Sequence, residues 1–372
     1  MAEVATQTCP KCDSCGKYDR RILITGGAGF IGSHVVIILV RRYPNYFIIN
    51  LDKLDYCASV KHLESIKDLP NYKFIQGDIC EPDFMRYIFE EEKIDTVMHF
   101  AAQSHVDLSF WSSLDFTRTN VFGSHVLVNA AHEAGVGLFI HASTDEVYGG
   151  NSVKALTEGA KMNPTNPYAA TKAAAECLVS SYWESFKFPV IITRANNAYG
   201  PHQYPEKVIP KFIALLERGS KCCIHGDGSA VRNFLFVTDM AEAYDIILHS
   251  GKPGEIYNIG SDFEISMINL AKQLITKCAI EGDANDLIDL GDDRPFNDMR
   301  YPMDSSKLHH LGWHPRVSWE SGLQQTIEWY RNPDNFDSWP SAVEALRPFP
   351  SGSNTMRISK ERMQRYKANA EK

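Results

Sequence analysis

Short runs of β-branched and aliphatic residues alternate with longer amphipathic stretches from residue 21 onward. Six runs are predicted to be strands, at residues 21–25, 46–51, 73–76, 96–100, 138–142 and 190–194. Their apolar residues are nearly continuous, which is typical of parallel strands that are buried on both faces. Between the strands, apolar residues recur three and four positions apart and predict helices, for example over residues 31–42 and 121–134. The alternation indicates an α/β fold, a doubly wound parallel sheet with helices on both faces.

Beyond about residue 194 the pattern changes, because Pro and Gly become frequent and divide the chain into shorter segments. Frequent Pro and Gly residues predict a smaller C-terminal α/β lobe. Ligands often bind where two lobes meet. We expect a first lobe over residues 20–198 and a substrate lobe over 199–350, with the chain interleaving between them. Residues 1–19 are expected to form a flexible extension and residues 351–372 a basic tail.

Composition narrows the classes of function. The chain has 372 residues, of which 44% are hydrophobic and 23% charged, as in ordinary globular proteins. A formal net charge of −8 argues against a nucleic-acid partner, which would require a basic surface. The longest aliphatic run, residues 35–40, is too short to span a bilayer, and the N-terminal segment lacks the apolar core of a secretory signal. We therefore expect neither nucleic acid nor membrane as a partner.

The nine cysteines are mostly scattered, which is typical of reduced thiols and predicts a cytoplasmic location. Cys9, Cys12 and Cys15 form a C-x-x-C-x-x-C motif ahead of the first predicted strand. Such steps suit a soft metal, but a tetrahedral zinc site needs a fourth ligand, and no paired Cys or His cluster is evident elsewhere. We favour an extension without metal over a metal site, and metal analysis would decide between them.

A glycine-rich turn points to a dinucleotide. Gly26, Gly29 and Gly32 follow the first predicted strand and open the next helix, where they allow a tight turn and close approach to a pyrophosphate. Asp52 ends the second strand, at the spacing where an acid binds the adenosine ribose and repels a 2′-phosphate; the alternative is a turn cap. The pattern predicts a Rossmann-type sheet that binds NAD rather than NADP. Its site is also expected to include Phe30, Ile31, Asp78, Ile79, Ala101, Ala102 and Ser104.

Tyr168 and Lys172 are predicted to project from the same face of a helix that Asn166 caps and Pro167 begins. A phenol is a poor base at neutral pH because its pKa lies near 10. A cation beside it favours the phenolate and makes it a competent general base. The pair is therefore a candidate for proton transfer beside the dinucleotide, and both residues are expected to line that site.

These features together resemble the extended short-chain dehydrogenase/reductase superfamily, with its TGGAGFIG turn, Tyr-x-x-x-Lys pair and a Ser/Thr after the fifth strand. Further segments are similar to the nucleotide-sugar 4,6-dehydratases that act on dTDP-glucose or UDP-glucose. They are AAQSHVD (101–107), STDEVYG (143–149), YAATKAAAE (168–176), RANNAYGP (194–201), EKVIPKF (206–212), DRP (293–295) and DMRY (298–301). The resemblance runs from about residue 20 to about residue 330.

The resemblance implies a lyase reaction, the NAD-dependent conversion of an NDP-glucose to an NDP-4-keto-6-deoxyglucose. Loss of water between C5 and C6 needs one group to remove the C5 proton and another to protonate the leaving hydroxyl. The resemblance implies Asp145 as the acid and Glu146 as the base. Tyr168, supported by Lys172, takes the C4 hydroxyl proton, and Thr144 hydrogen-bonds the 4-oxygen. NAD is regenerated in each turnover and should be held tightly.

By the same resemblance, a set of polar and cationic residues is expected to hold the diphosphate sugar, since Arg suits phosphate through paired donors. The set is Ser104, Thr144, Asn197, Lys207, Arg232, Arg294 and Tyr301. The sequence does not decide between uridine and thymidine. The resemblance also implies a homodimer that pairs helices over residues 121–134 and 169–186.

Two alternatives stay open at this stage. One is an NAD-dependent epimerase or decarboxylase for sugar nucleotides on the same scaffold, although related epimerases carry no acid pair like Asp145 and Glu146. The other is a regulatory NAD-binding protein without catalysis. The intact set of Thr144, Tyr168 and Lys172 weighs against the second alternative, because binding alone needs none of these residues.

Overall fold

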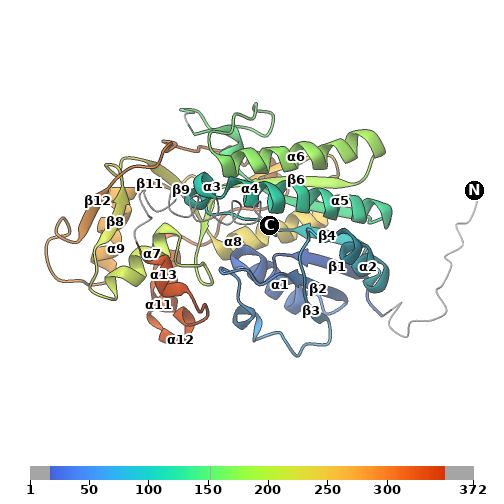
Figure 1. Cartoon of the computed structure of the whole chain (residues 1–372), viewed down its shortest axis with the longest axis horizontal. Coiled ribbons are helices and arrows are strands. Elements are labelled where there is room, and N and C mark those ends of the chain that lie inside the picture. The colour runs from blue at the N-terminus through green and yellow to red at the C-terminus, as the bar shows by residue number, and fades with distance from the viewer. Residues whose placement is uncertain (1–16, 151, 348–372) are drawn as a thin grey trace, which may run out of the picture.

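In the computed structural model, which describes residues 17–150 and 152–347, a seven-stranded parallel sheet lies at the centre of the fold (Figure 1). Cys9, Cys12, Cys15 and the expected basic tail at 351–372 lie outside the described residues. The strand order is β10 (Ile256–Ile259), β6 (Val190–Ala195), β5 (Leu138–Thr144), β4 (Thr96–His99), β1 (Arg20–Thr25), β2 (Tyr46–Asp52) and β3 (Tyr72–Gln76). The predicted doubly wound parallel sheet is thus confirmed, and β10 adds a strand that the sequence pattern did not predict.

Alternating residues of the strands pack into two separate cores, which explains their continuous hydrophobicity. In β1, Ile22 and Ile24 pack into the core with α1 (Phe30–Arg42) and α8 (Val237–Ser250). Leu23, between them, packs into the core on the other face. That face is covered by α2 (Pro82–Glu92), α5 (Ser124–Glu133) and α6 (Pro167–Phe186). In Figure 1, α5 and α6 lie toward the top of the view, and α8 and α1 lie lower, with β1 to β3 beside α1.

The helix expected over residues 121–134 differs from the prediction. It starts earlier, as α4 (Ser113–Phe116), continues through a π-helical turn, η2 (Thr117–Gly123), and ends as α5. Inside the turn, Asn120 accepts a hydrogen bond from the backbone N–H of Gln103 at 2.8 Å and donates to Thr171 Oγ1 at 3.0 Å. The wider turn therefore ties the loop after β4 to α6, as π-turns often do near functional sites.

Elsewhere in the described chain, shorter elements form the second lobe. A mixed sheet contains β7 (Asn197–Tyr199), β9 (Val231–Phe236) and β11 (Glu264–Ser266), and β8 (Cys222–His225) pairs with β12 (Ile288–Gly291). Their common core also includes α7 (Val208–Leu216), α9 (Met267–Lys277), α11 (Trp319–Arg331), α12 (Pro333–Phe336) and α13 (Ala342–Ala345). Residues after 198 also return to the first lobe, as α8 and β10.

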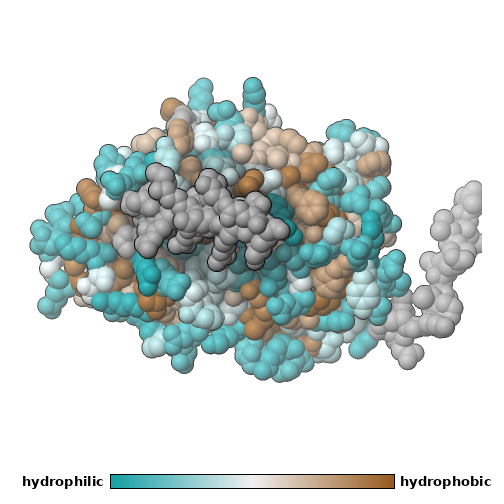
Figure 2. Space-filling model, in the orientation of Figure 1, coloured by the Kyte–Doolittle hydropathy of each residue, from teal (hydrophilic) through white to brown (hydrophobic). Residues whose placement is uncertain are grey.

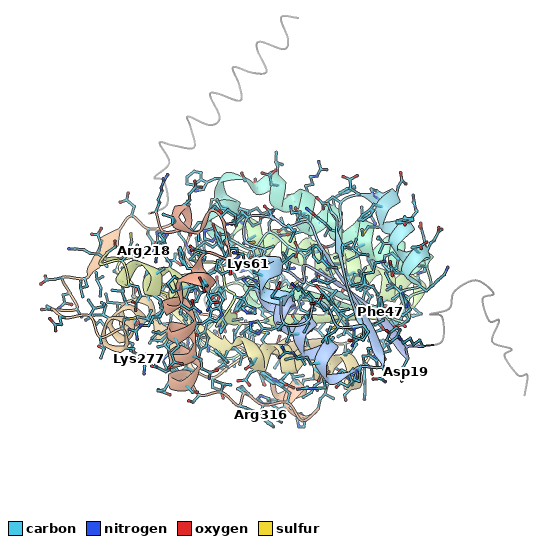
Figure 3. The ribbon with its side chains drawn as sticks, turned by 90° about the horizontal axis from the view of Figure 1, so that it is seen from below. Asp19, Phe47, Lys61, Arg218, Lys277 and Arg316 are labelled. Atoms are coloured by element: carbon cyan, nitrogen blue, oxygen red, sulfur yellow. The ribbon has the colours of Figure 1, made fainter. Side chains whose placement is uncertain are left out.

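The C-terminal helices contact both lobes. Lys61, in the 3-10 helix η1 (Val60–Leu63), donates from Nζ to the backbone oxygen of Asp337 at 3.0 Å, and Figure 3 shows it beside the C-terminal helices. The other short helices are α3 (Val106–Trp111), η3 (Asp145–Tyr148) and α10 (Ser306–His309). Among the described residues, no helix combines the length and apolar character needed to cross a membrane.

Candidate active site

Two adjoining cavities open at the carboxyl ends of the central strands, where open α/β sheets bind ligands. The glycine cavity, about 230 Å³, is lined by the glycine turn and the end of β2. The carboxyl cavity, about 300 Å³, contains Asp145 and Glu146 and extends into the second lobe. Ser104, Tyr168 and Lys207 line both cavities. A ligand in one cavity therefore lies next to a ligand in the other, with Tyr168 at their junction.

The glycine turn has the backbone geometry that a dinucleotide requires. Gly26 adopts φ +73°, and a Cβ there would lie 2.6 Å from the backbone nitrogen of Ala101. A Cβ on Gly32 would lie 2.3 Å from the carbonyl oxygen of Gly26, so the helix packs on the turn only without a side chain. Gly29 faces more open space. The three glycines thus fit the predicted roles of tight turn, ligand approach and helix packing.

Asp52 is buried and binds the turn itself. Its Oδ2 accepts a hydrogen bond from the backbone N–H of Ala28 at 3.0 Å, and Oδ1 accepts one from that of Leu54 at 2.8 Å. Burial raises the pKa of this carboxyl, while the two backbone donors oppose the shift. Asp52 therefore caps the turn and also lines the glycine cavity, and each oxygen keeps a second lone pair for a ligand hydroxyl.

All the residues predicted from sequence to bind a dinucleotide line this same cavity. They are Gly26, Gly29, Phe30, Ile31, Gly32, Asp52, Asp78, Ile79, Ala101, Ala102, Ser104, Tyr168 and Lys172. The fold brings them together from the ends of four strands, β1 to β4, and from α1 and α6, and their donor and acceptor groups fit NAD.

The carboxyl pair begins η3, directly at the end of β5. The Thr144 hydroxyl accepts from the backbone N–H of Glu146 at 3.3 Å and donates to Asp145 Oδ1 at 3.1 Å. Each carboxyl also receives one asparagine amide: Asn196 Nδ2 donates to Asp145 Oδ2 at 2.7 Å, and Asn166 Nδ2 donates to Glu146 Oε2 at 2.8 Å. Asn166 also caps α6, as the sequence predicted. Both carboxyls are therefore held in fixed orientations.

The two carboxyls have different electrostatic surroundings. Burial, and then the negative charge of Glu146, raise the pKa of Asp145 to about 7. Burial also raises the pKa of Glu146, but the amide of Asn166 and the positive charge of Arg232 oppose that shift. Such an environment keeps a proton available on Asp145 near neutral pH, as a general acid requires.

The Tyr168–Lys172 pair differs from the sequence-based expectation. Lys172 Nζ donates to the backbone oxygen of Ala142 in β5 at 2.6 Å, and burial lowers its pKa to about 8. Burial, and then the charge of Glu146, raise the pKa of Tyr168, and a hydrogen bond with Thr144 opposes the shift only in part. In the protein alone burial therefore favours the neutral phenol, because it disfavours the charged phenolate.

Every residue that the sequence assigned to the diphosphate sugar lines the carboxyl cavity. They are Ser104, Thr144, Asn197, Lys207, Arg232, Arg294 and Tyr301. The cations already have protein partners. Lys207 Nζ donates to the backbone oxygen of Ser104 at 2.7 Å, and Arg294 Nε lies 2.5 Å from Asp107 Oδ1. These contacts hold both cations at the wall of the cavity.

Arg232 and Tyr301 belong to a network centred on Asp298. Arg232 donates to the backbone oxygen of Asp298 at 2.8 Å and to Asn297 Oδ1 at 2.9 Å. The Tyr301 hydroxyl donates to Asp298 Oδ2 at 2.5 Å, and the Arg232 guanidinium lies over the Tyr301 ring. The Asp298 carboxylate also accepts from Thr165 Oγ1 at 2.6 Å. The network therefore places the Arg232 guanidinium and the Asn297 amide at the wall of the carboxyl cavity.

Sequence reasoning missed three residues that organise the site: Asn196, Asp107 and Asp298. Asn196 stands next to Asn197 in RANNAYGP, and nothing in the sequence says which amide faces Asp145. Asp107 and Asp298 stand inside quoted motifs, AAQSHVD and DMRY, which gave a weak signal. In residues 17–150 and 152–347, no cluster of His, Cys, Asp and Glu has a metal-binding arrangement.

Comparisons with known proteins agree with this geometry. A family model described as GDP-mannose 4,6 dehydratase matches residues 23–326. A dTDP-D-glucose 4,6-dehydratase from Bos taurus is 60% identical over 346 residues, which cover 91% of this chain and 97% of the relative. A trifunctional enzyme from Arabidopsis thaliana, whose name begins with UDP-glucose 4,6-dehydratase, is 50% identical over 89% of this chain and 50% of its own length.

Solved structures are also similar to this chain. A dTDP-glucose 4,6-dehydratase from Streptomyces venezuelae with NAD and TYD bound superposes with a TM-score of 0.82 at 37% identity, covering 87% of this chain and 99% of that chain. A UDP-glucose 4-epimerase from Thermotoga maritima, with UDP-glucose, reaches a TM-score of 0.77 at 31% identity, covering 84% and 98%. On the family model and the identity to curated relatives, this chain belongs to the GDP-mannose 4,6 dehydratase family.

Proposed function

We propose that this protein is an NAD-dependent NDP-glucose 4,6-dehydratase, a hydro-lyase that forms an NDP-4-keto-6-deoxyglucose. The observation that carries the proposal is the buried Asp145–Glu146 pair, held in two unlike environments in a cavity that Tyr168 joins to the glycine cavity. An epimerase that only oxidises and re-reduces C4 has no use for two such carboxyls. The 60% identity to dTDP-D-glucose 4,6-dehydratases gives independent support.

In the proposed reaction each side chain moves or holds one proton. NAD held in the glycine cavity would supply a positive charge, a hydride acceptor for C4 and a hydride donor for C6. Tyr168, as the phenolate that the positive charge of bound NAD would favour, takes the C4 hydroxyl proton, while Thr144 hydrogen-bonds the 4-oxygen. Glu146 removes the C5 proton, which the 4-keto group has made acidic, and Asp145 protonates the leaving C6 hydroxyl. Glu146 then returns a proton to C5, and one water is lost. Tyr168 releases its proton to solvent and Asp145 takes one up from solvent, which restores both groups for the next turnover.

Product identification tests this proposal. The protein, loaded with NAD, is incubated separately with dTDP-glucose and UDP-glucose in deuterated water. We expect a 4-keto-6-deoxy sugar with deuterium at C5, since Glu146 exchanges its proton with solvent. Both nucleotides are assayed because the relatives at 60% and 50% identity are named for dTDP and UDP, respectively. Recovery of a C4 epimer that keeps its C6 oxygen would contradict dehydration and support the epimerase alternative.

Replacing Asp52 by Ala is expected to weaken NAD binding about tenfold or more, because hydrogen bonds to a charged group are lost. Retained NAD is measured by its absorbance after gel filtration. Asp239→Ala is the matched control, since Asp239 is also buried and accepts two backbone N–H groups, from Arg316 and Val317. The control should lose stability but retain NAD. Equal NAD retention by the Asp52 variant and wild type would contradict the assignment.

A homodimer is part of the proposal. Three large apolar side chains are exposed on α3, α4 and η2, next to α5 and α6: Trp111, Leu114 and Phe122. Leu114 is 82% exposed. Figure 2 shows apolar surface in the region of α5 and α6. Large apolar side chains exposed on neighbouring elements are typical of protein interfaces, and a second copy would cover the two helices that the family resemblance implied.

Leu114→Lys is therefore expected to shift the protein from dimer toward monomer, because a charge would be buried in the interface. Sedimentation velocity at micromolar concentration measures the effect. Val343→Lys on α13 is the control, since Val343 is also exposed but lies on the second lobe. Sedimentation of the wild-type protein as a monomer would overturn the dimer proposal.

We place the enzyme in the cytoplasm, where thiols stay reduced. In the part of the chain that the structure describes, the cysteines are free thiols. Cys80, Cys222 and Cys278 are buried, and burial raises the pKa of each thiol, which makes it less reactive. Cell fractionation with an antibody to the full chain tests the location, and recovery in a secretory fraction would contradict it.

A further inference from the structure

The amide of Asn196 has a fixed orientation behind the proposed general acid. Asn196 directly follows β6 and is buried. Its Oδ1 accepts a hydrogen bond from the backbone N–H of Ser261 at 3.2 Å, and its Nδ2 donates to Asp145 Oδ2 at 2.7 Å and to the backbone oxygen of Tyr301 at 3.3 Å. Because a backbone N–H only donates, the amide cannot be reversed without losing these bonds. Nδ2 must therefore face the carboxyl.

This orientation decides where the proton of Asp145 lies. Nδ2 has no lone pair to accept a proton, so Asp145 Oδ2 serves as the acceptor. The acidic proton is then on Oδ1. Thr144 Oγ1, 3.1 Å away, donates to Oδ1 while Asp145 is ionised. When Oδ1 carries the proton, the Thr144 hydroxyl can rotate its hydrogen toward the 4-oxygen, as the proposed reaction requires.

We propose that Asn196 is a positioning residue for the dehydration step, whose amide holds Asp145 so that Oδ1 delivers the proton to the leaving hydroxyl. The inference rests on the proposed function and goes beyond it by assigning the proton-donating atom and the residue that selects it. Asn196 acts through Asp145 and needs no contact with substrate.

Gly260 offers a second way to disturb the same amide. A Cβ at this position would lie 2.6 Å from Asn196 Oδ1, closer than non-bonded atoms approach. Gly260 follows β10, the strand that pairs with β6, so the approach is fixed by the central sheet. Gly260→Ala is therefore expected to displace the amide without changing any polar side chain of the site.

Other charged and titratable groups also act on Asp145. They are Glu146 on η3, Arg232 on β9 and Tyr168 on α6. Burial and Glu146 favour the protonated carboxyl, whereas the Asn196 amide and Arg232 favour the carboxylate. Removal of the amide leaves burial and Glu146 less opposed, so the pKa of Asp145 should rise. The alkaline limb of kcat, where the acid loses its proton, should then move to higher pH.

The test is the pH profile of kcat for Asn196→Ala and Gly260→Ala with the nucleotide sugar that the wild type converts. We expect kcat at pH 7 to fall about ten- to hundredfold, because the acid is misplaced. The alkaline limb should move up by about one pH unit, the size expected for one lost hydrogen bond to a charged group. Reduced nicotinamide should accumulate, since C4 oxidation does not use Asp145.

Asn233→Ala is the matched structural control. Asn233 is as buried as Asn196 and donates to the backbone oxygen of Ser261 at 2.9 Å, but it has no hydrogen bond to either carboxyl. It should lower thermal stability and keep the wild-type midpoint of the alkaline limb. If Asn196→Ala does not fold, Gly260→Ala provides the same comparison.

These measurements distinguish failure of the Asn196 assignment from failure of the proposed dehydratase function. An alkaline limb at the wild-type pH in folded Asn196→Ala, or in Gly260→Ala, would reduce Asn196 to a structural residue and overturn its assignment. A wild-type protein that forms no 4-keto-6-deoxy product would overturn the proposed function, and the Asn196 assignment with it.

Discussion

Replacing Asp145 by Asn is expected to lower kcat for the 4-keto-6-deoxy product about a thousandfold at pH 7, within the usual contribution of a general acid. The amide has nearly the shape of the carboxyl but cannot protonate the C6 hydroxyl. C4 oxidation depends on Tyr168 and should continue, so reduced nicotinamide accumulates. Stopped-flow measurement of its near-ultraviolet absorbance, alongside product analysis, separates the two steps.

Glu146→Gln is the companion variant, because it should also block water loss but for a different reason. Without the base, C5 should not exchange with deuterated water, whereas exchange should persist in the Asp145 variant. The Asp145→Ala, Glu146→Ala double variant should form no product above background. Product formation by that double variant at the wild-type rate would refute both assignments.

The same Asp145→Asn substitution should also change how the stability of the fold depends on pH. Burial raises the pKa of Asp145 from 3.8 in the unfolded chain to about 7 in the fold. The folded state therefore binds the proton more tightly, and this contribution to stability is complete below pH 4 and is lost as pH rises through 7. Thermal unfolding at pH 8 should show the Asn variant stabilised relative to wild type, with the difference vanishing at low pH.

Tyr168→Phe is expected to lower kcat about a thousandfold or more by stopping the reaction before C4 oxidation. The phenol ring is retained, but no oxygen is left to take the C4 hydroxyl proton. Unlike the Asp145 variant, this variant should produce neither reduced nicotinamide nor deuterium at C5. Absorbance and product analysis under the same conditions therefore distinguish the two.

Tyr182→Phe is the control for this substitution, since Tyr182 lies on the same helix, is buried, and donates its hydroxyl to Asn129 Oδ1 at 3.0 Å outside the cavities. It should keep near-normal activity. Wild-type rates of nicotinamide reduction in Tyr168→Phe would show that another group removes the C4 proton.

The central sheet and the glycine turn could be predicted from sequence because local chemistry determines them. A parallel strand covered on both faces must be apolar nearly throughout. The strands at the centre of the sheet satisfy that requirement, whereas β3, at its edge, carries Lys73 and Gln76. Gly26 is required because its left-handed backbone, close against Ala101, excludes a side chain. β10 was not predicted, since its four residues pair with β6, whose strand ends about sixty positions earlier in the chain. Such non-local pairing leaves no local signal.

The side chains of the site were also indicated by sequence, because Asp145, Glu146, Tyr168 and Lys172 stand in recognisable motifs. What the sequence by itself determined is therefore the fold class and the chemical groups available. Only the tertiary structure decided how those groups are partnered and charged. Asn196 reaches Asp145 across 51 positions, and complete burial raises the pKa of Tyr168. The physical reason is that desolvation and hydrogen bonding depend on atoms within a few ångströms, and distant segments of the chain supply them.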